Sequence, residues 1–273
     1  DGPTRSALLL TGNHILARHV LKVPQSPADN VWSGQRPVRI RLMPLWWRDD
    51  HVETVEIRAV HDGKTLALHL SWQDAVMDAR AVRTEEFSDA AAVQFSADDQ
   101  PPFLGMGSRQ SQVSVWYWRA DHAADTILAG IDTAFPDMIV NFYPFQKPAL
   151  TGVPGRGGTI DQQDPRFIAG VGSNNPVSEL RPPHSIQNLA ATGFGTLTPG
   201  HRPRTRIDGQ SEWNSGRWQL MLSRDLKVIS AHEIPLEPGH LVSVSFAIWE
   251  GSARDRGPRK QVSIWQTLRL EKP

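Results

Sequence analysis

The chain contains no cysteine among its 273 residues. This absence excludes disulfide bonds, zinc sites and iron–sulfur clusters with thiolate ligands, and haem attached through a Cys-x-x-Cys-His motif. Any iron-bearing group in this protein would therefore have to be held without a covalent bond between a cysteine and the group.

The sequence also lacks an excess of charge and any long hydrophobic run. Its 29 Lys and Arg residues balance its 29 Asp and Glu residues, so no overall field would attract nucleic acid or an anionic membrane. No apolar run approaches the roughly 20 residues of a spanning helix. The first residues, Asp1-Gly2-Pro3, lack the basic and apolar parts of an export leader. We therefore expect no nucleic acid partner and no membrane span, and a leader that was either removed or never present.

No sustained helical periodicity is present, whereas segments typical of β-strands recur along the chain. They are residues 38–42, 55–60, 65–72, 90–95, 113–118, 211–222, 241–249 and 261–270, of which 38–42 and 55–60 show the apolar–polar alternation of half-buried strands. His61-Asp62-Gly63-Lys64 predicts a hairpin turn between two of these segments. The sequence therefore predicts an all-β protein, an antiparallel β-sandwich.

We expect a single domain over residues 1–273. Residues 1–30 carry polar turn signals and are expected to form an extended N-terminal segment. Residues from about 120 to 200 are rich in Pro, Gly and Asn and predict a long, mostly irregular insertion. Phe142, Tyr143 and Phe145 in this insertion favour a packed rather than a disordered segment.

Met106 lies between Gly105 and Gly107, shortly before the tryptophan-bearing segment 113–118. Glycines on both sides reduce the bulk around the thioether and let the backbone approach a large, flat group. A thioether is a soft, neutral ligand that suits haem iron. Methionines also fill gaps in apolar cores, so this segment alone leaves both roles open.

Ten tryptophans allow a second interpretation, a carbohydrate-binding module. Six of them lie on expected strands, where packing in the core is the expected role. Trp46 and Trp47 lie in a connection flanked by proline, and together with Trp32 they could form an exposed platform for a sugar.

No catalytic motif is visible in the chain. The ten histidines are dispersed without metal-ligand spacing, and neither a nucleophile elbow nor a phosphate-binding loop is present. Glu85-Glu86 and Asp98-Asp99 fall in turn-like surroundings that are typical of a solvated surface. We therefore expect no catalytic site in this chain.

Several segments, taken in order, resemble one family of redox proteins. They are His61-Asp62-Gly63, 68–74 (LHLSWQD), 87–95 (FSDAAAVQF), 101–107 (PPFLGMG), 115–118 (VWYW), 193–198 (GFGTLT), 216–218 (GRW), 246–251 (FAIWEG) and 263–265 (SIW). In their order and spacing they resemble the haem-b-binding gamma subunits of type II dimethyl-sulfoxide-reductase-family molybdoenzymes. Members of this family serve ethylbenzene dehydrogenase, dimethyl sulfide dehydrogenase, selenate and chlorate reductases and nitrite oxidoreductases. The resemblance extends from about residue 30 to 270.

The resemblance implies a β-sandwich that holds one non-covalent haem b with a methionine and a lysine as axial ligands. Met106 matches the methionine. The sequence departs from the family at the second ligand, because the only lysine between Met106 and Lys227 is Lys147, and the segment before residues 193–196 offers His184. A neutral imidazole can bind iron. We therefore expect Met106 and His184 as axial ligands of the haem iron, with Lys147 as the alternative.

A lysine in this role would have to be neutral, which requires burial or the iron itself to lower its pKa. The insertion is expected to help form the haem pocket. Its candidates for covering the haem, for which plain packing is an equally open role, are Phe142, Tyr143, Phe145, Leu189 and Phe194.

The resemblance further implies an electron-transfer subunit with no bond chemistry of its own. The chain would relay electrons between an iron–sulfur beta subunit, in a heterotrimer with a molybdopterin alpha subunit, and an external carrier such as a c-type cytochrome. This would occur in the periplasm or an equivalent exported space. Two alternatives stay open, the carbohydrate-binding module and a scaffolding subunit that has kept the fold but lost the haem.

Overall fold

The structure is a computed structural model, and it describes residues 13–81, 85–98, 101, 105–122, 186–199, 207–228 and 233–272. The chain divides into two units, Asp1–Ala123 with His184–Pro273, and Ala124–Pro183. The second unit lies outside the described residues, so the expected irregular insertion and its role in a haem pocket remain predictions, as does the single-domain organisation.

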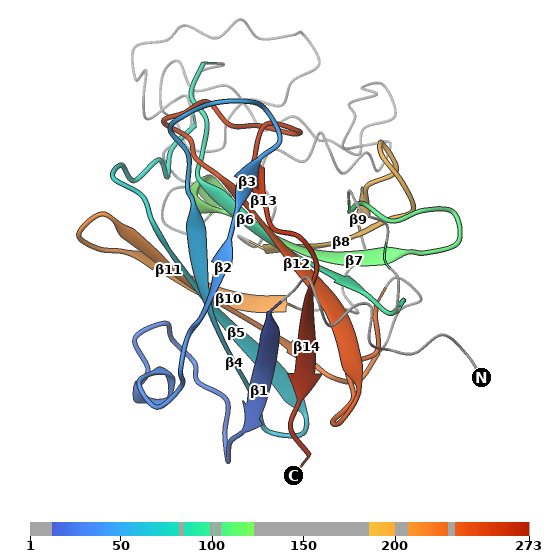
Figure 1. Cartoon of the computed structure of the whole chain (residues 1–273). Helices are drawn as coiled ribbons and strands as arrows, with labels where there is room; N and C mark the ends of the chain where they lie inside the picture. The colour runs from blue at the N-terminus through green and yellow to red at the C-terminus, as the bar shows by residue number, and fades with distance from the viewer. Residues whose placement is uncertain are drawn as a thin grey trace, which may run out of the picture. The chain divides into compact units, whose positions relative to one another are not determined.

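The first unit consists of β-strands with two short 3-10 turns, Asn30–Trp32 and Ala120–His122, among its described residues (Figure 1). One sheet, here called sheet A, has the strand order β9 (Thr198–Pro199), β8 (Ile186–Ala191), β7 (Val113–Arg119), β6 (Ala90–Ser96), β12 (Leu241–Trp249), β14 (Gln266–Leu270) and β1 (His14–His19), with β13 (Gln261–Val262) on β12 and β3 (Met43–Pro44) on β13. The other, sheet B, has the order β10 (Ile207–Trp213), β11 (Arg217–Asp225), β5 (Thr65–Gln73), β4 (Thr54–His61) and β1, with β2 (Val38–Arg41) on β4. No helix in the described part of the chain has the length and apolar character needed to cross a membrane.

Strand β1 belongs to both sheets. Its first residues, from His14 to Ala17, pair with β14, and Arg18 and His19 pair with β4. Both pairings are parallel, whereas the other strand pairs are antiparallel. The antiparallel β-sandwich is therefore confirmed, with β1 as the one strand whose pairings are parallel. The sequence did not predict this strand, because parallel partners distant along the chain are not joined by a local turn.

The main core lies between the two sheets, where alternate residues of each strand point inward. In β6 these are Ala91, Val93 and Phe95. Trp72, Trp118 and Trp218 contact one another with ring centroids 5.0 to 6.3 Å apart. The core role expected for these strand tryptophans is confirmed.

Most predicted strands agree with the structure within one or two residues, and β12 has the predicted bounds. The turn that separates β10 from β11 has positive φ at Ser215 and Gly216, as a tight hairpin requires. Strand β8 lies within residues 120–200, where the sequence predicted mostly irregular chain. Its alternate inward residues include Asn188, which weakens the apolar pattern of a strand.

Candidate functional site

A second apolar cluster lies on the face of sheet A that points away from the main core. Because side chains alternate along a strand, β6, β7, β8 and β12 each contribute to both faces. The buried residues of this outer face are Ala90, Ala92, Val113, Val115, Leu189, Ala191, Ala247 and Trp249. Four of them are alanines, so the face is shallow as well as apolar.

Met106 is half-buried and packs against this outer face. Its backbone lies in the left-handed region with φ of 59°, between Gly105 at 74° and Gly107 at 73°. Its N–H donates a hydrogen bond to Oε1 of Gln94 on β6 (3.3 Å), and its carbonyl accepts one from the N–H of Gly193 (2.8 Å). These contacts fix the methionine between β6 and the loop after β8.

The glycine beside Met106 is required by close backbone packing. A Cβ atom on Gly107 would lie 2.6 Å from the carbonyl oxygens of both Ala191 and Ser111. Gly107 therefore packs against backbone atoms of β8 and of the loop before β7, and the approach of this segment to a large, flat group remains a prediction.

Lys260, which sequence reasoning did not consider, reaches the same cluster from the loop between β12 and β13. Its Nζ lies 4.7 Å from the ring centroid of Trp249, whose ring also contacts Tyr117 edge-on at 5.4 Å. Burial lowers the pKa of the Lys260 ammonium, with no opposing contribution from a neighbouring carboxylate. Lys260 is half-buried, and a lysine of lowered pKa is the kind of amine that can become a neutral ligand.

Met106 and Lys260 belong to opposite ends of the outer face. Met106 is bonded to Gln94, whereas Trp249 beneath Lys260 pairs in register with Ala90. These two positions of β6 are separated by about 13 Å, at roughly 3.3 Å per residue. Ala92, a small residue, lies between them on the same face.

The other expected site residues divide between described and undescribed parts of the chain. His184 and Lys147 lie outside the described residues, as do Phe142, Tyr143 and Phe145. Leu189 is buried in the outer-face cluster, whereas Phe194 is 71% exposed. Among the described residues no group of three or more His, Cys, Asp or Glu side chains is arranged to hold a metal ion.

The prediction that Trp32 forms part of an exposed aromatic platform is wrong. This residue is only 4% exposed, donates from its Nε1 to the carbonyl of Ser26 (3.0 Å) and packs against His69. Trp46 and Trp47 are exposed, at 61% and 94%.

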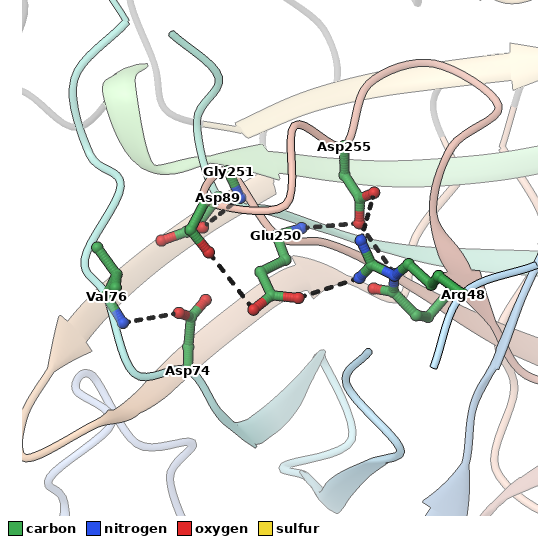
Figure 2. A network of polar contacts seen from close by, with 9 residues as sticks. Arg48, Asp74, Val76, Asp89, Glu250, Gly251 and Asp255 are labelled. Carbon is green, nitrogen blue, oxygen red and sulfur yellow. Dashed lines mark hydrogen bonds and ion pairs between the residues drawn. The ribbon is translucent and has the colours of Figure 1, made fainter. Parts of the chain in front are cut away.

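Three carboxyl groups that sequence reasoning missed point toward one another at the ends of β5, β6 and β12 (Figure 2). They belong to Asp74, Asp89 and Glu250. Asp89 is fully buried and accepts hydrogen bonds from the N–H groups of Asp78 and Gly251, both at 2.8 Å, and from Nε1 of Trp218 at 3.0 Å. The three residues lie in the segments 68–74, 87–95 and 246–251 that carry the family resemblance, but no local pattern brings them together, because they flank three separate strands.

The carboxyl group of Asp74 is short of hydrogen-bond donors. Its Oδ1 accepts from the N–H of Val76 (3.2 Å), and its Oδ2 is buried without a partner. Burial, together with the charge of Asp89, raises the pKa of Asp74 to about 8. Burial raises the pKa of Asp89 to about 6, although its three hydrogen bonds act in the opposite direction.

Arg48 is the cation paired with this cluster. Its guanidinium lies 3.0 Å from Oε2 of Glu250 and 3.1 Å from Oδ1 of Asp255. Burial raises the pKa of Glu250, and the charge of Arg48 lowers it. Arg48 forms its ion pairs with Glu250 and Asp255, and the carboxyl groups of Asp74 and Asp89 form no ion pair with it.

Two proteins that are similar in sequence are named as subunits of redox enzymes. The chain is 24% identical to a proposed respiratory nitrate reductase heme subunit from Haloferax mediterranei over 250 residues, which cover 89% of this chain and 67% of the relative. It is 23% identical to the dimethylsulfide dehydrogenase subunit gamma from Rhodovulum sulfidophilum over 262 residues, 92% of this chain and 77% of the relative.

A solved structure shares the fold. A proposed carbohydrate-binding protein from Bacteroides uniformis aligns with a TM-score of 0.50 at 10% identity, over 96% of this chain and 100% of that one. At this identity the likeness concerns the fold alone.

The sequence profile of a family described as ethylbenzene dehydrogenase matches residues 29–261. This range covers most of the chain and includes Met106, Lys260 and the strands of the outer face. The chain belongs to the ethylbenzene dehydrogenase family.

Proposed function

We propose that this chain is an electron-transfer subunit that holds one haem b, without a covalent bond, on the outer face of sheet A. The observation that carries the proposal is the pairing of a left-handed, half-buried Met106 with a shallow apolar face of alanines. The names of the two relatives, a heme subunit and a gamma subunit, support the same assignment.

The residues present fit such a group. The alanines put small apolar side chains on this face, and Met106 offers a thioether, a neutral ligand that favours the ferrous state. Lys260 offers a half-buried amine at the other end of the face, and its lowered pKa makes loss of the proton easier. We therefore propose Met106 and Lys260 as the axial ligands among the described residues, with His184 and Lys147 as the alternatives to Lys260.

A haem bound here would supply a one-electron ferric–ferrous couple. Met106 and a nitrogen ligand of this chain would hold the iron, which would leave no open position for a substrate. Leu189, Tyr117 and Trp249 exclude water from the face, and this lowers the local dielectric and helps to set the reduction potential.

We further propose the partners and the compartment that the family resemblance implies. The chain would receive or deliver electrons through an iron–sulfur beta subunit bound to a molybdopterin alpha subunit. A c-type cytochrome or a similar carrier would be the external partner, and the complex would work in the periplasm. The gamma designation of the Rhodovulum relative supports a multi-subunit complex.

The absorption spectrum of the purified chain loaded with haem tests the proposal. We expect one haem per chain, a low-spin six-coordinate spectrum, and a changed spectrum or lost haem in both Met106→Ala and Lys260→Ala. Lys64→Ala, at an exposed lysine, is the matched control and should leave the spectrum unchanged. An unaltered spectrum in Met106→Ala removes this residue from the site.

The same measurement separates the alternatives. If His184→Ala or Lys147→Ala changes the spectrum and Lys260→Ala does not, the nitrogen ligand is not Lys260. A colourless protein that binds oligosaccharide through the exposed Trp46 and Trp47 would support the carbohydrate-binding module. A colourless protein without sugar binding would support a scaffolding subunit.

A further inference from the structure

We propose that Asp74, Asp89 and Glu250 form a proton-binding site coupled to the electron-transfer site, so that the cluster takes up one proton when the protein gains one electron. The coupling rests on the proposed function. The proton site itself rests only on the cluster, and the two parts are tested separately below.

The arrangement of the three carboxyl groups requires a shared proton. Their side chains converge in Figure 2, and the one cation beside them, Arg48, is engaged by Glu250 and Asp255. Asp74 is 3% exposed, and its Oδ2 has no hydrogen-bond donor among the described residues. A buried carboxylate oxygen without a donor is costly, whereas a protonated carboxyl group can itself donate to a neighbouring carboxylate.

The surrounding charges favour the protonated form. Repulsion between nearby carboxylates and burial act in the same direction, and together they keep the pKa of Asp74 near 8. The other charged groups that act on the pKa values of the cluster come from three elements: Asp78 after β5, Arg48 and Asp50 after β3, and Asp255 after β12. At the end of β7, Arg119, Asp121 and His122 flank Ala120, whose N–H donates to the carbonyl of Asp89, and they pair with one another.

The cluster adjoins the proposed electron-transfer site through the backbone. Asp89 directly precedes Ala90, and Glu250 directly follows Trp249, both of which lie on the outer face. An electron added to this poorly solvated region is a negative charge, which raises the proton affinity of a nearby carboxylate.

The coupled step balances in charge and atoms. One electron would come from a reduced iron–sulfur centre, or from dithionite in the test, and the haem would supply the ferric–ferrous couple that accepts it. One proton comes from bulk water, and a new O–H bond forms at a carboxylate oxygen of the cluster. The Glu250 side chain is 18% exposed and gives this proton a contact with solvent.

The coupling is tested by the midpoint potential of the haem-loaded protein as a function of pH. We expect the potential of the wild type to fall as the pH rises above about 8, where Asp74 would lose its proton in the oxidised protein and keep it in the reduced one. Asp74→Asn, which cannot titrate, should lose this dependence, and Asp98→Asn, at an exposed residue, should keep it. The same pH dependence in Asp74→Asn and wild type would overturn the coupling.

The proton site is tested without haem, by thermal melting at several pH values. A carboxyl group whose pKa is raised in the folded state binds more protons there than in the unfolded chain, so its contribution to stability falls as the pH rises from about 4 to about 8. We expect Asp74→Asn to melt above the wild type at pH above 8, and Asp98→Asn to follow the wild type. Equal pH profiles would overturn the proton site.

Three further outcomes decide between the two parts of the proposal. If Asp74→Asn does not fold, the reduced-minus-oxidised infrared spectrum of the wild type should show a carboxylic acid carbonyl band that appears on reduction, and its absence contradicts the coupling. Melting that Ca²⁺ raises and a chelator lowers would show that a cation occupies the cluster. A protein that binds no haem but shows the Asp74-dependent melting profile would refute the proposed function and leave the proton site intact.

Discussion

At the scale of the residue, the backbone of Met106 is the most unusual feature of the described chain. Positive φ costs a residue with a side chain roughly 1 to 2 kcal/mol, and here three successive residues have it. Such strain persists only where the surroundings enforce it, and it concentrates at functional sites. The two backbone hydrogen bonds of Met106, to Gln94 and from Gly193, supply that enforcement.

We predict that the haem-free Met106→Gly protein is more stable than Met106→Ala by about 1 kcal/mol, because glycine adopts positive φ without steric cost. Both variants lose the thioether, so the difference between their free energies of unfolding reports the cost of the backbone conformation at residue 106. Urea unfolding of the two proteins measures it, and a more stable alanine variant would show that the loop is not strained at this residue.

A second prediction concerns the packing around Gly107. Gly107→Ala should cost at least about 2 kcal/mol more than Gly63→Ala, because overpacking adds to the shared cost of positive φ. Gly63 is the matched control, since it also has positive φ but no atom within 4 Å of an added Cβ. Equal free energies of unfolding for the two variants would mean that the loop moves to accept the methyl group.

At the scale of the element, Asp89 connects the ends of three strands. Its carboxyl group accepts from the loop after β5, from Trp218 on β11 and from Gly251 after β12. These contacts hold the end of β5 and the start of β11 in sheet B near the start of β6 and the end of β12 in sheet A.

We predict that Asp89→Ala lowers the free energy of unfolding by about 3 kcal/mol or more, because three buried donors lose their acceptor. Asp89→Asn should lose less, since its amide oxygen still accepts. Asp98→Ala, at an exposed position, should stay within about 0.5 kcal/mol of the wild type. Denaturant unfolding at pH 7 compares the three, and losses of equal size would refute the bridging role.

The strands that the sequence predicted are those with strong apolar alternation and a local turn, such as β4 and β5 around Asp62 and Gly63. The Asp62 side chain caps this turn through the N–H groups of Lys64 and Thr65. Strands β1 and β8 were missed. β1 has parallel partners far away in the chain, and β8 presents Asn188 where an apolar residue would mark the inner face.

At the scale of the whole molecule, sheet A has two apolar faces, one in the sandwich core and one that carries Met106. The glycines around Met106 made that residue predictable. Lys260 was not predictable in the same way. It contacts Trp249, and Trp249 lies on the same face as Met106 only because β12 pairs with β6 in this register. The carboxyl cluster likewise depends on how three strand ends meet.

If the outer face holds the cofactor, filling its middle should block binding without disturbing the core on the other side. We predict that Ala92→Leu weakens haem binding at least about tenfold, because the added atoms occupy the face between the two ligands. Ala92→Gly keeps the face open and serves as the control. Haem titration followed by absorption measures both affinities, and equal affinities would place the cofactor elsewhere.

A crystal structure of the haem-loaded chain would locate the cofactor. We expect Met106 and Lys260 to hold the iron near Ala92, through the thioether sulfur and the amine nitrogen. Iron bound away from the outer face of sheet A, or without the sulfur of Met106, would contradict this expectation.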